Sequence, residues 1–155
     1  RDRLSCLVGS EMCIRDSFKT KVMNEIAPIS MSHLYQLEDL KKCEGDVFEN
    51  FKKFNIALFQ RTTRDGTWHM ESYTDDLDKL TINVTTCANV ELFGELGVPE
   101  LGMFGCDHDL AGYAAIEDDV SCDFRRLCTI AKGDPICVFE FYRKGTALDN
   151  AHLNK

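Results

Sequence analysis

The sequence has 155 residues, 44% of them hydrophobic, and a formal net charge of −8. This length is enough for one domain with a packed core. An acidic chain without a cluster of lysine and arginine is a poor binder of nucleic acid or of an anionic membrane, and no apolar run reaches the roughly 18 residues of a membrane span. We therefore expect no nucleic-acid or membrane partner, while composition leaves the oligomeric state open.

The first residues do not have the pattern of a folded element. Residues 6–17 read CLVGSEMCIRDS, whose apolar run is shorter than the about 7–15 residues of a signal-peptide core and has no helical or alternating period. Back-translated, the stretch resembles the adapter of transposase-based sequencing-library kits. We interpret residues 1–17 as a translated adapter and expect the natural chain to start near Phe18, inside a truncated reading frame. A buried Leu7 or Met12 would contradict this interpretation.

Two of the eight cysteines fall in that stretch. Without a signal peptide, the others are typical of reduced thiols in a cytoplasmic protein, either buried or functional. They are Cys43, Cys87, Cys106, Cys122, Cys128 and Cys137.

Helical periodicity dominates the segment from Ser32 to Thr63. Apolar residues recur there at spacings of three and four, which predicts amphipathic helices interrupted near Gly45. These residues are Leu34, Leu37, Leu40, Phe48, Phe51, Phe54 and Leu58. A turn is predicted at Arg64-Asp65-Gly66.

Alternating residues then predict a β-hairpin. Residues 67–74 read TWHMESYT and residues 79–87 read KLTINVTTC, and Asp75-Asp76-Leu77-Asp78 lies between them as the turn. After Cys87, the run ANVELFGELG predicts a short helix closed by Gly97, with Pro99 just beyond it.

A second helix and a second hairpin complete the predicted elements. Residues 99–116 are expected to form the helix, and residues 122–131 and 136–144 two strands joined by Lys132-Gly133-Asp134-Pro135. The order predicts an α+β fold: N-terminal amphipathic helices and an antiparallel sheet of about four strands, with two helices between its hairpins. We expect residues 18–145 to form one domain and residues 146–155 to form a loose tail.

Candidate chemical groups concentrate in the run GCDHDLAGY at residues 105–113. In a helix, Cys106 and Asp109 share a face with Tyr113, whereas Asp107 and His108 point elsewhere. The carboxylate alone would raise the pKa of the thiol, so a nucleophilic Cys106 needs a cation, a metal or a helix N-terminus nearby.

Other interpretations of these residue types remain open. A single cysteine on an element is more often a small core residue than a nucleophile, and Cys128 and Cys137, on facing predicted strands, are candidates for core packing. His33, His69 and His152 are expected at the surface. The residues alone therefore predict an α+β domain with a thiol or metal site.

Four motifs, taken together, resemble the L-2-amino-thiazoline-4-carboxylic acid hydrolase family. They are NVTTC at residues 83–87, FGELGVPELG at 93–102, CDHD at 106–109 and TIAKGDPICVFEF at 129–141, in the family's order. The sequence departs from the family pattern between Tyr113 and Cys122, where AAIEDD replaces a longer polar loop.

The resemblance implies hydrolytic opening of an amino-thiazoline ring, with cleavage of a carbon–nitrogen bond on a route to L-cysteine. It makes Cys106 a candidate nucleophile or metal ligand, and Asp107 and Asp109 candidates for proton transfer or ligation. Asn83, Cys87 and Tyr113 are the implied substrate-binding residues. Cys137 also matches a family motif, but a mid-strand position is compatible with a structural role.

A second resemblance leads to a different class of function. The ending GDPICVFEF is similar to the C-terminal hairpin of vinyl-4-reductase-type ligand-binding domains, some of which hold a metal through cysteines. In that alternative the protein is a small-molecule-binding or zinc-stabilised sensor module. The candidate metal ligands are Cys87, Cys106, Cys128 and Cys137.

Overall fold

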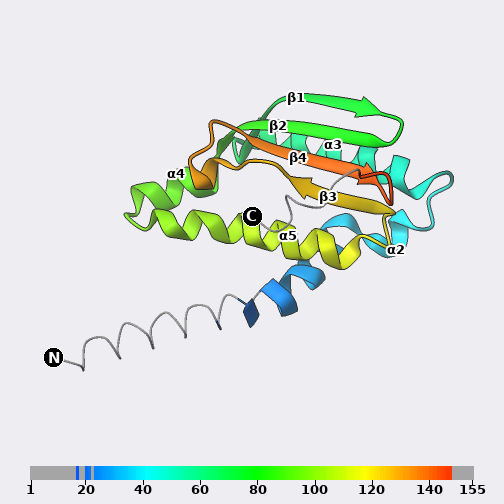
Figure 1. Cartoon of the computed structure of the whole chain (residues 1–155), viewed down its shortest axis with the longest axis horizontal. Coiled ribbons are helices and arrows are strands. Elements are labelled where there is room, and N and C mark those ends of the chain that lie inside the picture. The colour runs from blue at the N-terminus through cyan, green and yellow to red at the C-terminus, as the bar shows by residue number, and fades with distance from the viewer. Residues whose placement is uncertain (1–16, 18–19, 22, 148–155) are drawn as a thin grey trace.

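The computed structural model describes residues 17, 20–21 and 23–147 (Figure 1). The predicted adapter-derived stretch lies outside these residues except for Ser17. Most of the predicted C-terminal tail, including His152, lies outside them as well. His33 and His69 are exposed, as predicted.

The N-terminal part is helical with two interruptions. Residues 23–35 are helical, and Gln36, in a left-handed conformation (φ 46°), separates them from α2 (Leu37–Leu40). After a second break that contains Gly45, α3 (Val47–Asp65) begins where the Asp46 carboxylate accepts a hydrogen bond from the Glu49 amide (2.9 Å). Gly66, at φ 76°, ends α3. The predicted amphipathic helices, their break near Gly45 and the turn after α3 are confirmed.

The strands form one antiparallel sheet. They are β1 (Trp68–Asp76), β2 (Lys79–Cys87), β3 (Cys122–Arg126) and β4 (Cys137–Arg143), in the spatial order β1-β2-β4-β3. All three pairings are antiparallel, which confirms the predicted α+β class with a four-stranded sheet. β1 continues to Asp76, so only Leu77 and Asp78 turn the first hairpin.

The two helices predicted between the hairpins are present. α4 (Ala88–Glu95) is followed by Gly97 at φ 75°, a 3₁₀ turn η1 (Pro99–Gly102) and α5 (Met103–Ile116). The segment predicted as one helix therefore begins with a 3₁₀ turn. Within the described part of the chain, no helix combines the length and the apolar character needed to cross a membrane.

The second hairpin differs from its prediction, because β3 ends at Arg126. Residues 127–136 form a wide connection that contains the 3₁₀ turn η2 (Ile130–Lys132). The side chain of Asp134 accepts a hydrogen bond from the Thr129 amide (2.8 Å), and the Ile130 amide donates to Cys137 Sγ (3.2 Å). Because these backbone donors are satisfied locally, they do not extend the strand ladder. Cys128 consequently lies in the connection and not in a strand, and its carbonyl oxygen accepts a hydrogen bond from the Val138 amide of β4 (3.2 Å).

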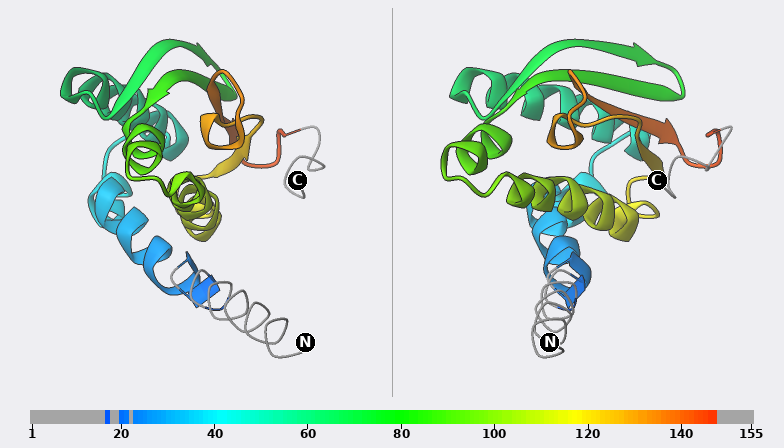
Figure 2. Two further views of the ribbon diagram at one scale, coloured as in Figure 1. Left: turned by 90° about the vertical axis from the view of Figure 1, so that its left-hand side faces the viewer. Right: turned by 60° about the vertical axis from the view of Figure 1, so that its left-hand side comes forward.

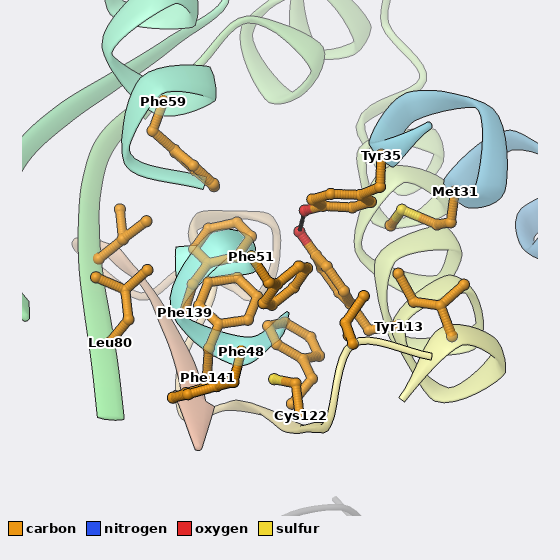
Figure 3. Close-up of a cluster of buried hydrophobic side chains, with 14 of the residues drawn as sticks. Met31, Tyr35, Phe48, Phe51, Phe59, Leu80, Tyr113, Cys122, Phe139 and Phe141 are labelled. Carbon is orange, nitrogen blue, oxygen red and sulfur yellow. Dashed lines mark hydrogen bonds between the residues drawn. The ribbon is translucent and has the colours of Figure 1, made fainter. Parts of the chain in front are cut away.

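The core lies between one face of the sheet and the helices (Figure 2, Figure 3). Alternate residues of the two central strands, Leu80, Ile82 and Val84 in β2 and Phe139 and Phe141 in β4, are buried there. The helices lie on this side of the curved sheet, and the rings of Phe51 and Phe59 in α3 contact Phe141 and Phe139 edge-on.

A buried polar chain joins three helices in this core. The Tyr35 hydroxyl donates to Asn55 Oδ1 (2.8 Å) in α3 and is 2.7 Å from the hydroxyl of Tyr113 in α5 (Figure 3). Burial raises the pKa of both phenols well above the usual range, so both stay protonated. The helix of residues 23–35 is thereby fixed to the elements that build the site.

Candidate active site

A cavity of about 150 Å³ lies where the end of β2, the start of α4, α5 and the strands β3 and β4 meet. Its apolar walls include Trp68, Val84, Val90 and Phe139. Its polar and thiol groups are Cys87, Asn89, Cys106, His108, Asp109, Arg126, Thr129 and Cys137.

Two glycines allow α4 and the start of α5 to pack closely at this cavity. A Cβ atom on Gly105 would lie 3.2 Å from Asn89 Nδ2, and one on Gly102 would lie 3.5 Å from two atoms of Val90. A larger residue at Gly105 would have to displace the Asn89 side chain. The glycines that precede Cys106 therefore leave room for α4 to pack against the start of α5.

The charged part of the cavity wall is an ion pair between α5 and β3. Arg126 Nη2 is 2.5 Å from Asp109 Oδ2, and the two side chains are 5% and 18% exposed. The guanidinium also lies over the Phe139 ring, 4.0 Å from its centroid. Burial works against the charge of Arg126, but the carboxylate of Asp109 outweighs it and raises the pKa of the guanidinium. The cavity therefore presents a fixed cation beside a carboxylate.

Two buried thiols are connected through one hydroxyl group. Thr129 Oγ1 is 3.1 Å from Cys106 Sγ and 3.4 Å from Cys137 Sγ. Burial raises the pKa of the Cys106 thiol, and the Thr129 hydrogen bond and the positive charge of Arg126 oppose this only in part. The Cys106 thiol is consequently protonated near neutral pH.

His108 is a further ionisable side chain in the cavity wall. Its Nε2 contacts Ser30 Oγ in the first helix, and its Nδ1 is 3.8 Å from Asp109 Oδ1. An imidazole and a carboxylate thus lie side by side on α5 at the edge of the cavity.

A second cavity of about 260 Å³ lies on the other side of Cys106, Arg126 and Thr129. Its lining consists of those three residues together with Met103, Asp107, Leu110, Leu127, Cys128, Lys132 and Asp134. Cys106, Arg126 and Thr129 therefore form a shared wall between the two cavities.

Comparison with known proteins gives the family. The model of the L-2-amino-thiazoline-4-carboxylic acid hydrolase family matches residues 17–141. The chain belongs to this family. The match extends over the N-terminal helices as well as the four motifs, so Ser30 and His108 both lie inside the matched region. No curated protein and no solved structure matches the chain.

The cavity of this hydrolase-family member contains three of the predicted catalytic and substrate-binding residues, together with Cys137 from the candidate metal ligands. Cys106 and Asp109 lie on its α5 wall, and Cys87 lies where β2 ends. Asp107 does not share this cavity but lines the second one, because it follows Cys106 on the helix and points to another side.

Asn83 and Tyr113, two of the predicted substrate-binding residues, do not line this cavity. Asn83 alternates with the buried Ile82 and Val84, so it points to the opposite face of the sheet, where it donates to Ser72 Oγ (3.0 Å). Tyr113 lies one turn beyond Asp109 and is buried in the core against Tyr35 and Phe124.

The four candidate metal ligands of the zinc alternative do not converge. Among the described residues, no group of three or more histidine, cysteine, aspartate or glutamate side chains is arranged to hold a metal ion. Cys128 is in the connection after β3, and Thr129 lies between the thiols of Cys106 and Cys137. The residues of this family member therefore do not fit a closed zinc site.

Arg126, Thr129 and His108 were missed as site residues in the sequence. A signal for Arg126 was present, because alternation in CDFRR places Cys122, Phe124 and Arg126 on one face of the strand. A charged residue on a core-facing strand position requires a buried counter-ion. No comparable signal exists for Thr129, whose position depends on the connection after β3.

Proposed function

We propose that this protein hydrolyses a small amino-thiazoline carboxylic acid and opens its ring, as a cytoplasmic step on a route to L-cysteine. The proposal rests on the buried pair of Arg126 and Asp109 in the wall of a small cavity, in a chain of this family. The free thiols of the described cysteines agree with the proposed compartment.

The pair matches the two polar ends of such a substrate. A guanidinium group is suited to bind a carboxylate through paired hydrogen bonds, and a carboxylate accepts hydrogen bonds from the N–H groups of an amidine-like ring. A ligand that carries both groups can therefore be oriented by Arg126 and Asp109 together. The cavity has a volume of about 150 Å³, which suits a small ligand such as a single substituted ring.

The reaction needs no oxidant or reductant. Water adds across the ring carbon–nitrogen double bond, with its oxygen on the carbon between nitrogen and sulfur and one hydrogen on the nitrogen. The bond from this carbon to the ring nitrogen then breaks, and the second hydrogen of the water passes to the departing nitrogen. The oxygen of water becomes the carbonyl oxygen of the product. Such a step requires a base for the proton of water and a donor for the departing nitrogen.

Water, and not the Cys106 thiolate, is the nucleophile in this proposal, because burial raises the pKa of that thiol. Replacing Cys106 by serine keeps a hydroxyl group for Thr129 and removes the sulfur. We expect Cys106→Ser to retain kcat within about tenfold of wild type, whereas loss of a covalent nucleophile lowers kcat by about 10³-fold or more.

The measurement is release of the ring-opened product from L-2-amino-thiazoline-4-carboxylic acid by the full chain, followed by mass spectrometry. Cys43→Ser is the matched control, because Cys43 is exposed and lies outside both cavities. A loss of about 10³-fold in Cys106→Ser, with the control unchanged, would establish the thiol as the nucleophile. No product from folded wild-type chain would remove the proposed function.

A further inference from the structure

The helix of residues 23–35 approaches α5 unusually closely at Gly112. A Cβ atom on Gly112 would lie 2.4 Å from Met31 Cγ and 3.4 Å from the Ala27 carbonyl oxygen. His108 is one helical turn before Gly112 and lies on the same side of α5. This close contact places Ser30, the neighbour of Met31, against the imidazole of His108.

The contacts of Ser30 favour one tautomer of His108. A serine hydroxyl has one hydrogen atom, and the Ser30 hydroxyl donates it to the Ala27 carbonyl oxygen (3.1 Å). With that hydrogen on the Ala27 carbonyl, Ser30 Oγ is an acceptor for His108 Nε2, and this arrangement favours the neutral tautomer whose proton is on Nε2. Nδ1 is left with a free lone pair beside the cavity, 3.8 Å from Asp109 Oδ1.

We propose that His108 is the base of the ring-opening reaction, through Nδ1, and that Ser30 is the residue that positions it. In this role, which rests on the proposed function, Nδ1 takes a proton from water as the oxygen bonds to the ring carbon. Nδ1 then gives this proton to the ring nitrogen, which completes the addition of water across the carbon–nitrogen double bond. As the remaining carbon–nitrogen single bond breaks, the second hydrogen of the water passes from the hydroxyl oxygen to the departing nitrogen and the carbonyl group forms. His108 is neutral again at the end of the cycle, and both hydrogens of the water are on the released nitrogen.

Asp109 and Arg126 lie beside the Nδ1 side of His108. Asp109 Oδ1 faces the imidazolium formed in the first step, and Arg126 holds the other oxygen of this carboxylate, which fixes its orientation. Arg126 from β3 and Asp109 from α5 are the other charged groups in the cavity lining, whose remaining titratable groups are the thiols of Cys87, Cys106 and Cys137. Ser30 is the contact from the first helix.

The tautomer of His108 can be measured without turnover. In full-length chain labelled with ¹⁵N-histidine, nitrogen shifts of His108, assigned with His108→Gln, are expected to show a protonated Nε2 in the neutral ring. Ser30→Ala should give a mixture of tautomers. Ser32→Ala is the matched control, because Ser32 is exposed on the same helix. A wild-type ring protonated at Nδ1, or a tautomer unaffected by Ser30→Ala, would overturn the positioning role.

Kinetics test the base role separately. Ser30→Ala is expected to lower kcat about tenfold with little change in KM, since misorientation of a base acts on the chemical step. Ser30→Thr, which keeps the hydroxyl group, should recover most of kcat. If folded wild-type chain opens no ring, the base role fails together with the proposed function, while the tautomer result still decides the contact between Ser30 and His108. An unchanged kcat in Ser30→Ala, with product formed by wild type, would overturn this inference alone.

Discussion

Replacing His108 by glutamine is expected to lower kcat by about 10²- to 10⁴-fold, the usual contribution of a general base. Glutamine is close in size and can still donate a hydrogen bond to Ser30, but it has no basic nitrogen beside Asp109. KM should change little, because Arg126 and Asp109 remain in place to bind the substrate. The measurement is the initial rate of ring opening against substrate concentration.

His33→Gln is the matched control for this substitution, because His33 is exposed and lines neither cavity. The control should keep the wild-type rate. The unfolding midpoint of His108→Gln should also stay close to that of wild type, so that lost activity is not lost folding. A His108→Gln variant that keeps wild-type kcat would mean that another group, such as Asp109, takes the proton.

Breaking the pair of Arg126 and Asp109 is expected to cost both folding stability and activity. Asp109→Asn leaves a guanidinium that is 5% exposed without its counter-ion, and Arg126→Met leaves a carboxylate that is 18% exposed without its cation. Removing one partner of a buried pair typically costs about 3–5 kcal/mol. Each single variant should therefore unfold at markedly lower urea concentration than wild type.

The double variant separates the pair interaction from other effects. If the cost arises from the stranded charge, Asp109→Asn combined with Arg126→Met should be no less stable than either single variant. Asp118→Asn is the control, because Asp118 pairs with Lys144 at the exposed surface and its loss should leave the unfolding midpoint unchanged. Additive losses in the double variant would show that the two residues stabilise the fold independently.

The sequence predicted the fold well wherever local patterns decide it. The periodicity of Phe48 and Phe51 and the alternation of Leu80 and Ile82 are local signals, and the corresponding helix and strand end within a few residues of the predictions. The connection after Arg126 was predicted incorrectly, because residues 127–131 continue an apolar alternation. The hydrogen bonds that interrupt the strand, from the Thr129 amide to Asp134 and from the Ile130 amide to Cys137, connect residues that the alternation does not relate.

The site was predictable only where its residues share one element. Cys106 and Asp109 are one helical turn apart, so their common face follows from spacing. Arg126 reaches Asp109 from β3, and Ser30 reaches His108 from a helix 78 residues earlier in the sequence. Contacts of this kind depend on tertiary packing at positions such as Gly112, and a single sequence contains no periodic signal for them.

The most direct test of the central claim is ring opening by a variant whose cavity is filled. Val90 lines the cavity, so Val90→Trp should block substrate binding, while Leu92→Trp adds the same side chain at a position of the same helix that is 51% exposed. Wild type and Leu92→Trp are expected to convert L-2-amino-thiazoline-4-carboxylic acid to a product heavier by one water, and folded Val90→Trp is expected to form almost none. Equal product from Val90→Trp, or none from folded wild-type chain, would contradict catalysis in this cavity.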